Sequence, residues 1–177
     1  MRILFVLGPS GAGKSTLAEQ FGRRLGYLFY EIDQFPAADG IDAHQLRSEW
    51  NHFLKYAAPE KLVGELTKRV RAAGKAGIVL AFPSVLILSG QHLFALGGRV
   101  RVVYLTGTES QCRNAFLDRE LRNPRGLDAA HWERHNRSIF GFLTTPEGTK
   151  YAVRVFRDDG GRRSIEEIQT SILATPE

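Results

Sequence analysis

Eight consecutive residues near the amino terminus have the types and spacing of a phosphate-binding loop: Gly8-Pro9-Ser10-Gly11-Ala12-Gly13-Lys14-Ser15. The spacing Gly-x4-Gly-Lys-Ser is the P-loop pattern, in which glycines let successive backbone N–H groups point at phosphate oxygens. The Lys14 ammonium can reach the β- and γ-phosphates of ATP, and the Ser15 hydroxyl can ligate Mg2+. The residues predicted to contact the nucleotide are Gly8, Ser10, Gly11, Ala12, Gly13, Lys14, Ser15 and Thr16.

Two carboxylates, Glu31 and Asp33, lie at the end of residues 27–33, the second apolar run of the chain and an expected strand. Side chains alternate along a strand, so both carboxylates should lie on the same side, at the strand end nearest the phosphates. A carboxylate there can accept a proton from an attacking hydroxyl, or hold a water of the Mg2+ shell. The residue types alone leave open which of the two lies beside the metal.

An alternation of apolar runs and helical segments must position these groups. Strands are expected over residues 2–7, 27–33, 78–82, 99–105 and 151–156. Helices are expected over residues 14–25, 42–56, 60–73, 109–122 and 164–173. Strands separated by helices of this length imply βαβ units, and hence an α/β domain with a five-stranded parallel sheet flanked by helices. The carboxyl ends of such strands share one edge, where ligands bind.

The bulk composition bounds the remaining possibilities. A chain of 177 residues fits a single domain, which we expect to span 1–177. The net charge of +5 indicates an anionic partner, without separating nucleic acid from acidic metabolites or nucleotide phosphates. The one cysteine cannot form an internal disulfide. We see neither a secretory signal nor a membrane-spanning run, and we therefore expect a cytoplasmic protein.

Two missing motifs argue against a motor or a GTPase. A hydrolysing ATPase usually has an apolar strand ending in Asp, whereas the run 78–82 is followed by Pro83-Ser84. No Asn-Lys-x-Asp sequence, the guanine-reading motif, occurs in the chain.

Residues 8–16, followed by Glu31-Ile32-Asp33-Gln34, resemble the small-molecule kinases of the shikimate kinase, gluconate kinase and nucleoside monophosphate kinase group. The resemblance implies a P-loop NTPase fold, and ATP and Mg2+ as cofactors. In shikimate kinases the second strand ends in Asp-x-Asp. By that resemblance Glu31 takes the metal-side place, and Asp33 contacts the acceptor and its reacting hydroxyl.

The resemblance also implies a small arginine-rich lid, over about residues 119–136. Residues 102–107 are similar to the fourth strand of gluconate kinases, and the helix after them would lead into the lid. Arginines of such a lid meet the transferred phosphoryl group, where they neutralise charge that develops in the transition state. The residues given this catalytic role are Arg119, Arg122 and Arg125. Arg113 would lie near the adenine, and the loop 157–162 occupies the position of an adenine-contacting loop.

The acceptor is where the chain departs from these kinases. Shikimate kinases have a triple-glycine turn after the third strand, in place of which stands Ala81-Phe82-Pro83-Ser84. Gluconate kinases have His-Pro after the second-strand acid, whereas this chain has Gln34-Phe35-Pro36. Arg47 lies in the usual acceptor-binding region and is predicted to contact an acidic or phosphorylated acceptor.

We therefore predict Mg2+-dependent phosphoryl transfer from ATP to a hydroxyl of a small polar or anionic molecule. Two alternatives stay open. One is a kinase that acts on a nucleotide or a polynucleotide 5′-hydroxyl, and the other is a non-catalytic ATP-binding sensor.

Overall fold

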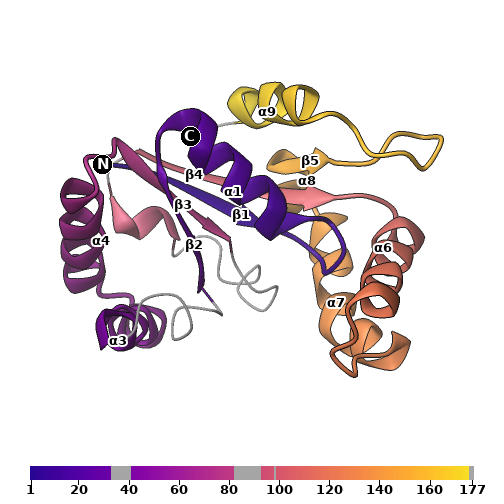
Figure 1. Cartoon of the computed structure of the whole chain (residues 1–177), viewed down its shortest axis with the longest axis horizontal. Helices are drawn as coiled ribbons and strands as arrows, with labels where there is room; N and C mark the ends of the chain where they lie inside the picture. Colours follow the sequence, from indigo (N-terminus) through magenta and orange to yellow (C-terminus); the bar gives the residue numbers. More distant parts are fainter. Residues whose placement is uncertain (33–40, 82–92, 98, 176–177) are drawn as a thin grey trace.

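The computed structural model describes residues 1–32, 41–81, 93–97 and 99–175. Within these residues, parallel strands form one five-stranded sheet in the order β2-β3-β1-β4-β5 (Figure 1). The strands are β1 (Arg2–Leu7), β2 (Leu28–Glu31), β3 (Gly77–Ala81), β4 (Arg99–Thr106) and β5 (Ala152–Arg154). The chain adds strands on one side of β1 and then on the other, which makes the carboxyl end of β1 the topological switch point.

Helices cover both faces of this sheet. They are α1 (Lys14–Leu25), α3 (Ile41–Tyr56), α4 (Glu60–Ala72), α6 (Glu109–Arg122), α7 (Ala129–Leu143), α8 (Pro146–Lys150) and α9 (Ile165–Ala174), with a short 3-10 helix at Phe94–Leu96. The predicted α/β fold with a parallel sheet is confirmed. Among the helices described, none is long and apolar enough to cross a bilayer.

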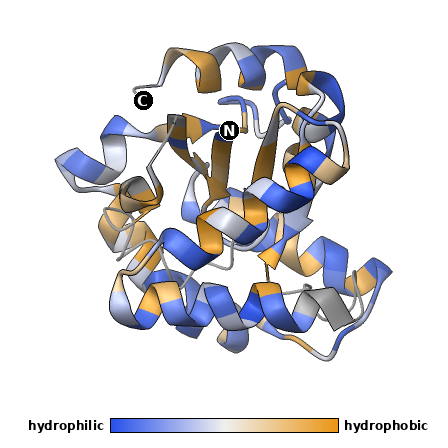
Figure 2. Cartoon of the chain, turned by 90° about the vertical axis from the view of Figure 1, so that its left-hand side faces the viewer, coloured by the Kyte–Doolittle hydropathy of each residue, from blue (hydrophilic) through white to orange (hydrophobic). Residues whose placement is uncertain are grey.

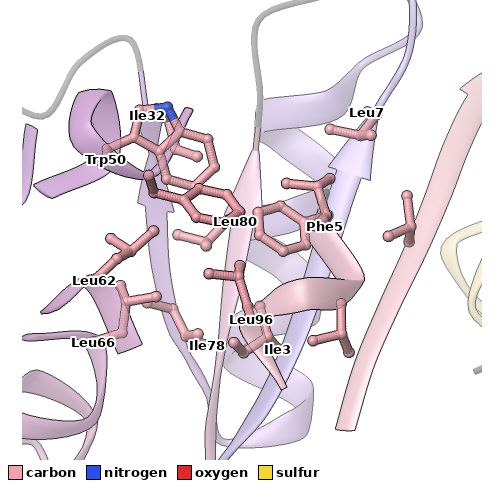
Figure 3. Packing of buried hydrophobic residues seen from close by; sticks show 14 of the residues in the cluster. Ile3, Phe5, Leu7, Ile32, Trp50, Leu62, Leu66, Ile78, Leu80 and Leu96 are labelled. Carbon is pink, nitrogen blue, oxygen red and sulfur yellow. The ribbon is translucent and has the colours of Figure 1, made fainter. Parts of the chain in front are cut away.

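Two apolar cores separate the layers. Ile3, Phe5 and Leu7 of β1 point into one core, which α3 and α4 close (Figure 3). The intervening residues Leu4 and Val6 point into the other, which α1 and α9 cover. Figure 2 shows the result, with hydrophobic strands at the centre and helices in which hydrophilic and hydrophobic residues alternate. Strands buried on both faces explain the continuous apolar runs in the sequence.

Three predicted elements agree with the structure to the residue: 2–7, 14–25 and 109–122. Strand β5 is shorter than the predicted 151–156, because the chain turns back on itself and Phe156 pairs with Arg162 in an antiparallel bridge. The described part of β2 ends at Glu31, and Asp33 lies outside the described residues.

Candidate active site

The predicted phosphate loop lies between the end of β1 and the start of α1, at the switch point of the sheet. Three of its glycines have positive φ angles: 131° at Gly8, 93° at Gly11 and 86° at Gly13. A side chain at such angles is strained, whereas glycine adopts them freely. The backbone of this loop therefore requires the glycines that the sequence places there.

Four backbone N–H groups at this turn have no hydrogen-bond partner among the described residues: those of Gly11, Gly13, Ser15 and Thr16. In contrast, the N–H of Ala12 donates to the carbonyl oxygen of Pro9 at 3.2 Å. Unpaired N–H groups gathered at the start of a helix favour an anion, and the helix dipole adds to that preference.

Two side chains next to the loop supply the other groups that ATP and a cation need. The Lys14 Nζ donates to the carbonyl oxygen of Pro9 at 3.1 Å, at the base of the loop. The Ser15 hydroxyl donates to the Glu31 carboxylate, which joins the first turn of α1 to the end of β2. A hydroxyl and a carboxylate are oxygen ligands of the kind that Mg2+ prefers, so this pair fits the metal that the sequence predicted.

A cavity of about 630 Å3 opens over the loop. Its polar lining combines loop residues with basic side chains from α6, α7 and the segments beside them. The residues concerned are Ser10, Gly11, Gly13, Lys14, Ser15, Thr16, Glu31, Arg119, Arg122, Arg125, His131, His135, Arg162 and Arg163. The structure thus brings most of the predicted nucleotide-binding residues to one cavity with Glu31 and the three predicted catalytic arginines. Gly8, Ala12 and Arg113 do not line it, and Asp33 lies outside the described residues.

A buried carboxylate holds the arginines at the rim of this cavity. Glu120 is 8% exposed. Its carboxylate accepts hydrogen bonds from the Arg125 Nε at 2.9 Å and from the Arg125 backbone N–H at 3.1 Å. The Arg125 Nη2 also contacts this carboxylate, and Arg119 adds a fourth contact at 3.4 Å. The hydrogen bond from the Arg125 side chain lowers the pKa of Glu120, despite burial, so this carboxylate is charged at neutral pH.

The sequence is 34% identical over 143 residues to the shikimate kinase of Actinobacillus succinogenes, and the match covers 78% of this chain and 77% of that one. The chain belongs to the shikimate kinase family. Shikimate kinase 1 of Citrobacter koseri is also 34% identical, over 121 residues that cover 67% of this chain and 66% of the relative. No family model matches the sequence.

Several solved structures show the same fold as this shikimate kinase family member. A gluconokinase from Sinorhizobium meliloti superposes with a TM-score of 0.51 at 20% identity, over 97% of this chain and 89% of that one. A sugar kinase from Janibacter sp. superposes with a TM-score of 0.56 at 18% identity, over 99% of this chain and 94% of that one. The shikimate kinase of Aquifex aeolicus superposes with a TM-score of 0.50 at 19% identity, over 99% of this chain and 95% of that one.

Membership of the shikimate kinase family settles the class of activity. The chain is an ATP-dependent phosphotransferase that acts on a hydroxyl of a small molecule, as the sequence predicted. The alternative of a non-catalytic ATP sensor is not supported by these relatives.

The segment that the family resemblance assigned to a lid, 119–136, has two parts in the structure. Helix α6 ends at Arg122, and α7 begins at Ala129 after a turn. Trp132 and Asn136 of α7 are 1% and 0% exposed, so this half is packed into the body of this kinase. The arginine-bearing turn at 122–127 is the exposed half, and a lid that closes there stays a prediction.

Two residues predicted to contact ligands lie away from the cavity. Arg113 makes an ion pair with Glu133 of α7 at 3.7 Å and does not line the cavity. Arg47 is exposed on α3 and is also absent from the lining. The contacts of Arg113 with the adenine and of Arg47 with the acceptor stay predictions.

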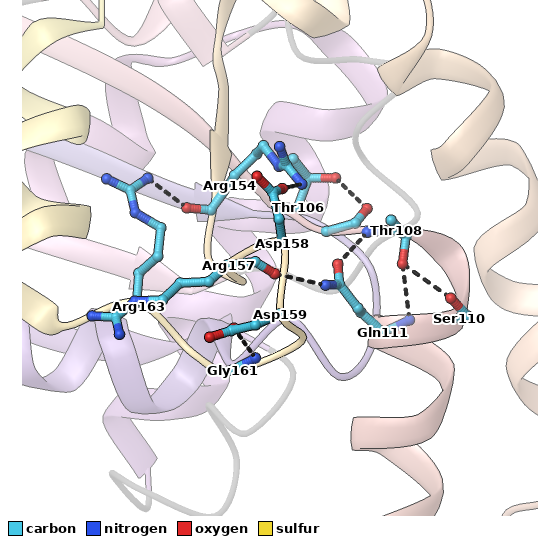
Figure 4. A network of polar contacts seen from close by, with 11 residues as sticks. Thr106, Thr108, Ser110, Gln111, Arg154, Arg157, Asp158, Asp159, Gly161 and Arg163 are labelled. Atoms are coloured by element: carbon cyan, nitrogen blue, oxygen red, sulfur yellow. Dashed lines mark hydrogen bonds and ion pairs between the residues drawn. The ribbon is translucent and has the colours of Figure 1, made fainter.

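The structure adds Arg162, which the sequence did not single out. Its guanidinium donates to the carbonyl oxygens of Gly11 at 2.8 Å and Ala12 at 3.2 Å, and it lies over the Phe156 ring at 4.7 Å. The hairpin that carries it is tied to α6, since Gln111 donates to the Arg157 carbonyl oxygen at 3.1 Å (Figure 4). The only sequence signal was the position of this loop after the fifth strand.

Cys112 is a structural residue in this family member. It is fully buried beneath the loop, and burial raises the pKa of its thiol to about 11, against the opposing effects of Lys14 and Arg162. A thiol with this pKa remains protonated at neutral pH and is a poor nucleophile.

Proposed function

We propose that this kinase transfers the γ-phosphoryl group of Mg–ATP to a hydroxyl of a small hydroxylated acid. The observation that supports the proposal is the convergence of Lys14, Ser15 and Glu31 with three arginines on one cavity. The relatives are named for shikimate, which makes this acid the first acceptor to test. The absence of a triple-glycine turn after β3 is the reason to test other sugar acids beside it.

The residues around the loop divide the work of binding. Lys14 and the unpaired N–H groups of the loop bind the phosphates. Ser15 and Glu31 hold Mg2+, because they supply adjacent oxygen ligands. A magnesium ion bound there would neutralise charge on the β- and γ-phosphate oxygens. Glu31 is thus assigned to the metal and Asp33 to the acceptor, where its carboxylate orients or deprotonates the attacking hydroxyl.

The rim arginines complete the site. Negative charge spreads over the γ-phosphoryl oxygens in the transition state, and a cation is most effective when it is already held nearby. Arg119, Arg122 and Arg125 line the cavity that holds Lys14. We assign to these three arginines the role of neutralising the charge on the γ-phosphoryl oxygens, and Glu120 holds Arg125 in place.

The decisive experiment is a coupled assay of ADP release with Mg–ATP and a panel of acceptors. The panel contains shikimate, gluconate and other sugar acids, nucleosides, nucleotides and 5′-hydroxyl oligonucleotides. We expect shikimate or a sugar acid to stimulate ADP release, and Lys14→Ala to remove the stimulation. Stimulation by nucleotides or oligonucleotides alone would replace the proposed acceptor class by the other kinase that the sequence left open.

Replacing the metal-side carboxylate should change the dependence on Mg2+. In Glu31→Gln the side chain that accepts the Ser15 hydroxyl loses its negative charge. We expect the Mg2+ concentration for half-maximal activity to rise about tenfold or more. Glu19→Gln is the matched control, because Glu19 is an exposed carboxylate on α1 that pairs with Arg23. Mg2+ titrations that coincide for Glu31→Gln and the wild type would remove Glu31 from the metal site.

A further inference from the structure

Helix α7 binds the phosphate loop through two buried side chains. The Asn136 Oδ1 accepts the backbone N–H of Ser10 at 2.7 Å, and its Nδ2 donates to the Trp132 carbonyl oxygen at 2.7 Å. The Trp132 Nε1 donates to the Ser10 carbonyl oxygen at 2.9 Å. Both backbone polar groups of Ser10 are therefore fixed by residues more than a hundred positions away in the chain.

The peptide bond between Pro9 and Ser10 connects Asn136 to Lys14. Its N–H donates to Asn136, and its carbonyl oxygen accepts the Lys14 Nζ at 3.1 Å and the Ala12 N–H at 3.2 Å. A peptide unit is planar and rigid, so a rotation that breaks the bond to Asn136 also moves the oxygen that holds Lys14. Hydrogen bonds at the two ends of one peptide polarise each other and strengthen the chain.

Burial makes the link to Asn136 costly to lose. Asn136 is 0% exposed, and its carbonyl and amide groups are both bonded within the protein. The hydrogen bond from the Ser10 N–H is half-buried, and a donor there that loses its acceptor is poorly satisfied, so the loop would rearrange to satisfy Ser10. The loop atoms that would move stand directly before the unpaired N–H groups assigned to the phosphates.

We propose that Asn136, assisted by Trp132, is a positioning residue for phosphoryl transfer. Through the Pro9–Ser10 peptide it fixes the Lys14 ammonium and the loop N–H groups in the geometry that binds ATP. The same helix carries His131 and His135 on the cavity wall and begins where the arginine-bearing turn ends. Helix α7 thus links the wall of the cavity to the phosphate loop. The proposal rests on the phosphate-binding role of this loop within the proposed function.

The test compares Asn136→Ala and Trp132→Phe with Ile139→Ala. Ile139 is a matched control, because it is buried on the same helix but packs in the core on the other face of the sheet. Thermal unfolding and the stoichiometry of ADP binding give the folded fraction of each variant. The ADP dissociation constant, kcat, and KM for ATP and for the acceptor are then measured per folded molecule.

For Asn136→Ala we expect kcat/KM for ATP to fall about tenfold to a hundredfold, and the ADP dissociation constant to rise about tenfold. Trp132→Phe keeps an aromatic side chain and the bond from Asn136 to Ser10, but removes the indole N–H and one of the two fused rings, so its loss should be smaller, about threefold to tenfold. The KM for the acceptor should change less than about twofold in both variants, since Asn136 acts on the phosphate side. Ile139→Ala should unfold at a lower temperature with unchanged kinetic constants.

Kinetic constants per folded molecule that match the wild type in Asn136→Ala would overturn the proposal, and so would equal losses in Ile139→Ala. The ADP dissociation constant does not depend on the acceptor. If the wild type phosphorylates no acid of the panel but binds ADP, the proposed acceptor class fails. The comparison of ADP affinities still decides the role of Asn136.

Discussion

Replacing Lys14 by alanine is expected to lower kcat/KM for ATP by on the order of a thousandfold. Its ammonium lines the cavity and lies at the base of the loop, 3.1 Å from the Pro9 carbonyl oxygen. The transferred phosphoryl group carries several negative charges and lies against the protein, where the effective dielectric constant is lower than in bulk water. A fixed cation is therefore worth several times more there than at the surface.

The measurement is a steady-state assay with the best acceptor from the panel, together with ADP binding and thermal unfolding. Lys68→Ala is the matched control, because it removes the same charge from an exposed position on α4. We expect the control to keep its activity and both variants to unfold near the wild-type temperature. A Lys14→Ala enzyme that retains more than about a tenth of the wild-type kcat/KM would contradict the assignment of the loop to phosphate binding.

Local signals explain why much of the architecture was predictable. Residues 3–7 are apolar on both faces, and α1 ends at Gly26, whose φ angle of 65° stops the helix. Helix α6 begins at a capping box in which Thr108 and Gln111 bond each other's backbone. Each boundary is set by residues within a few positions, so the sequence contains what is needed to place it.

The unpredicted part of the site depends on distant contacts. Asn136 meets Ser10 across 126 positions, and Arg162 meets Ala12 across 150. An asparagine within a helix and an arginine after two glycines have many ordinary roles, and no local pattern distinguishes these two. The extent of α7 could have been found, because Asp128 is a suitable cap and Trp132, Asn136 and Ile139 follow at helical spacing. The contacts of Asn136 and Trp132 with the phosphate loop could not have been found from the sequence.

Substituting alanine for Gly11 is expected to destabilise the fold and remove ATP binding together. Gly11 has a φ of 93°, and a Cβ there would lie 2.0 Å from the carbonyl oxygen of Cys112 and 3.1 Å from the backbone nitrogen of Phe116. Both atoms belong to the backbone of α6, which cannot turn aside as a flexible side chain can. Relief requires a shift of the phosphate loop or of α6. We expect the free energy of unfolding to fall by on the order of 4 kcal/mol.

Gly26→Ala separates this clash from backbone strain. Gly26 also has a positive φ, of 65°, but a Cβ there meets nothing within 4 Å. Its replacement should cost about 1 kcal/mol, the penalty for an alanine in left-handed backbone, and should leave ADP affinity unchanged. Urea unfolding and ADP titration measure the loss of stability and the ADP affinity of each variant.

Equal losses of stability in the two variants would mean that α6 is not packed against Gly11 as described. A Gly11→Ala protein that is destabilised but binds ADP normally would mean that α6 yields while the loop keeps its shape. The larger loss in Gly11→Ala, accompanied by loss of ADP binding, is the result that the close contact between loop and α6 requires.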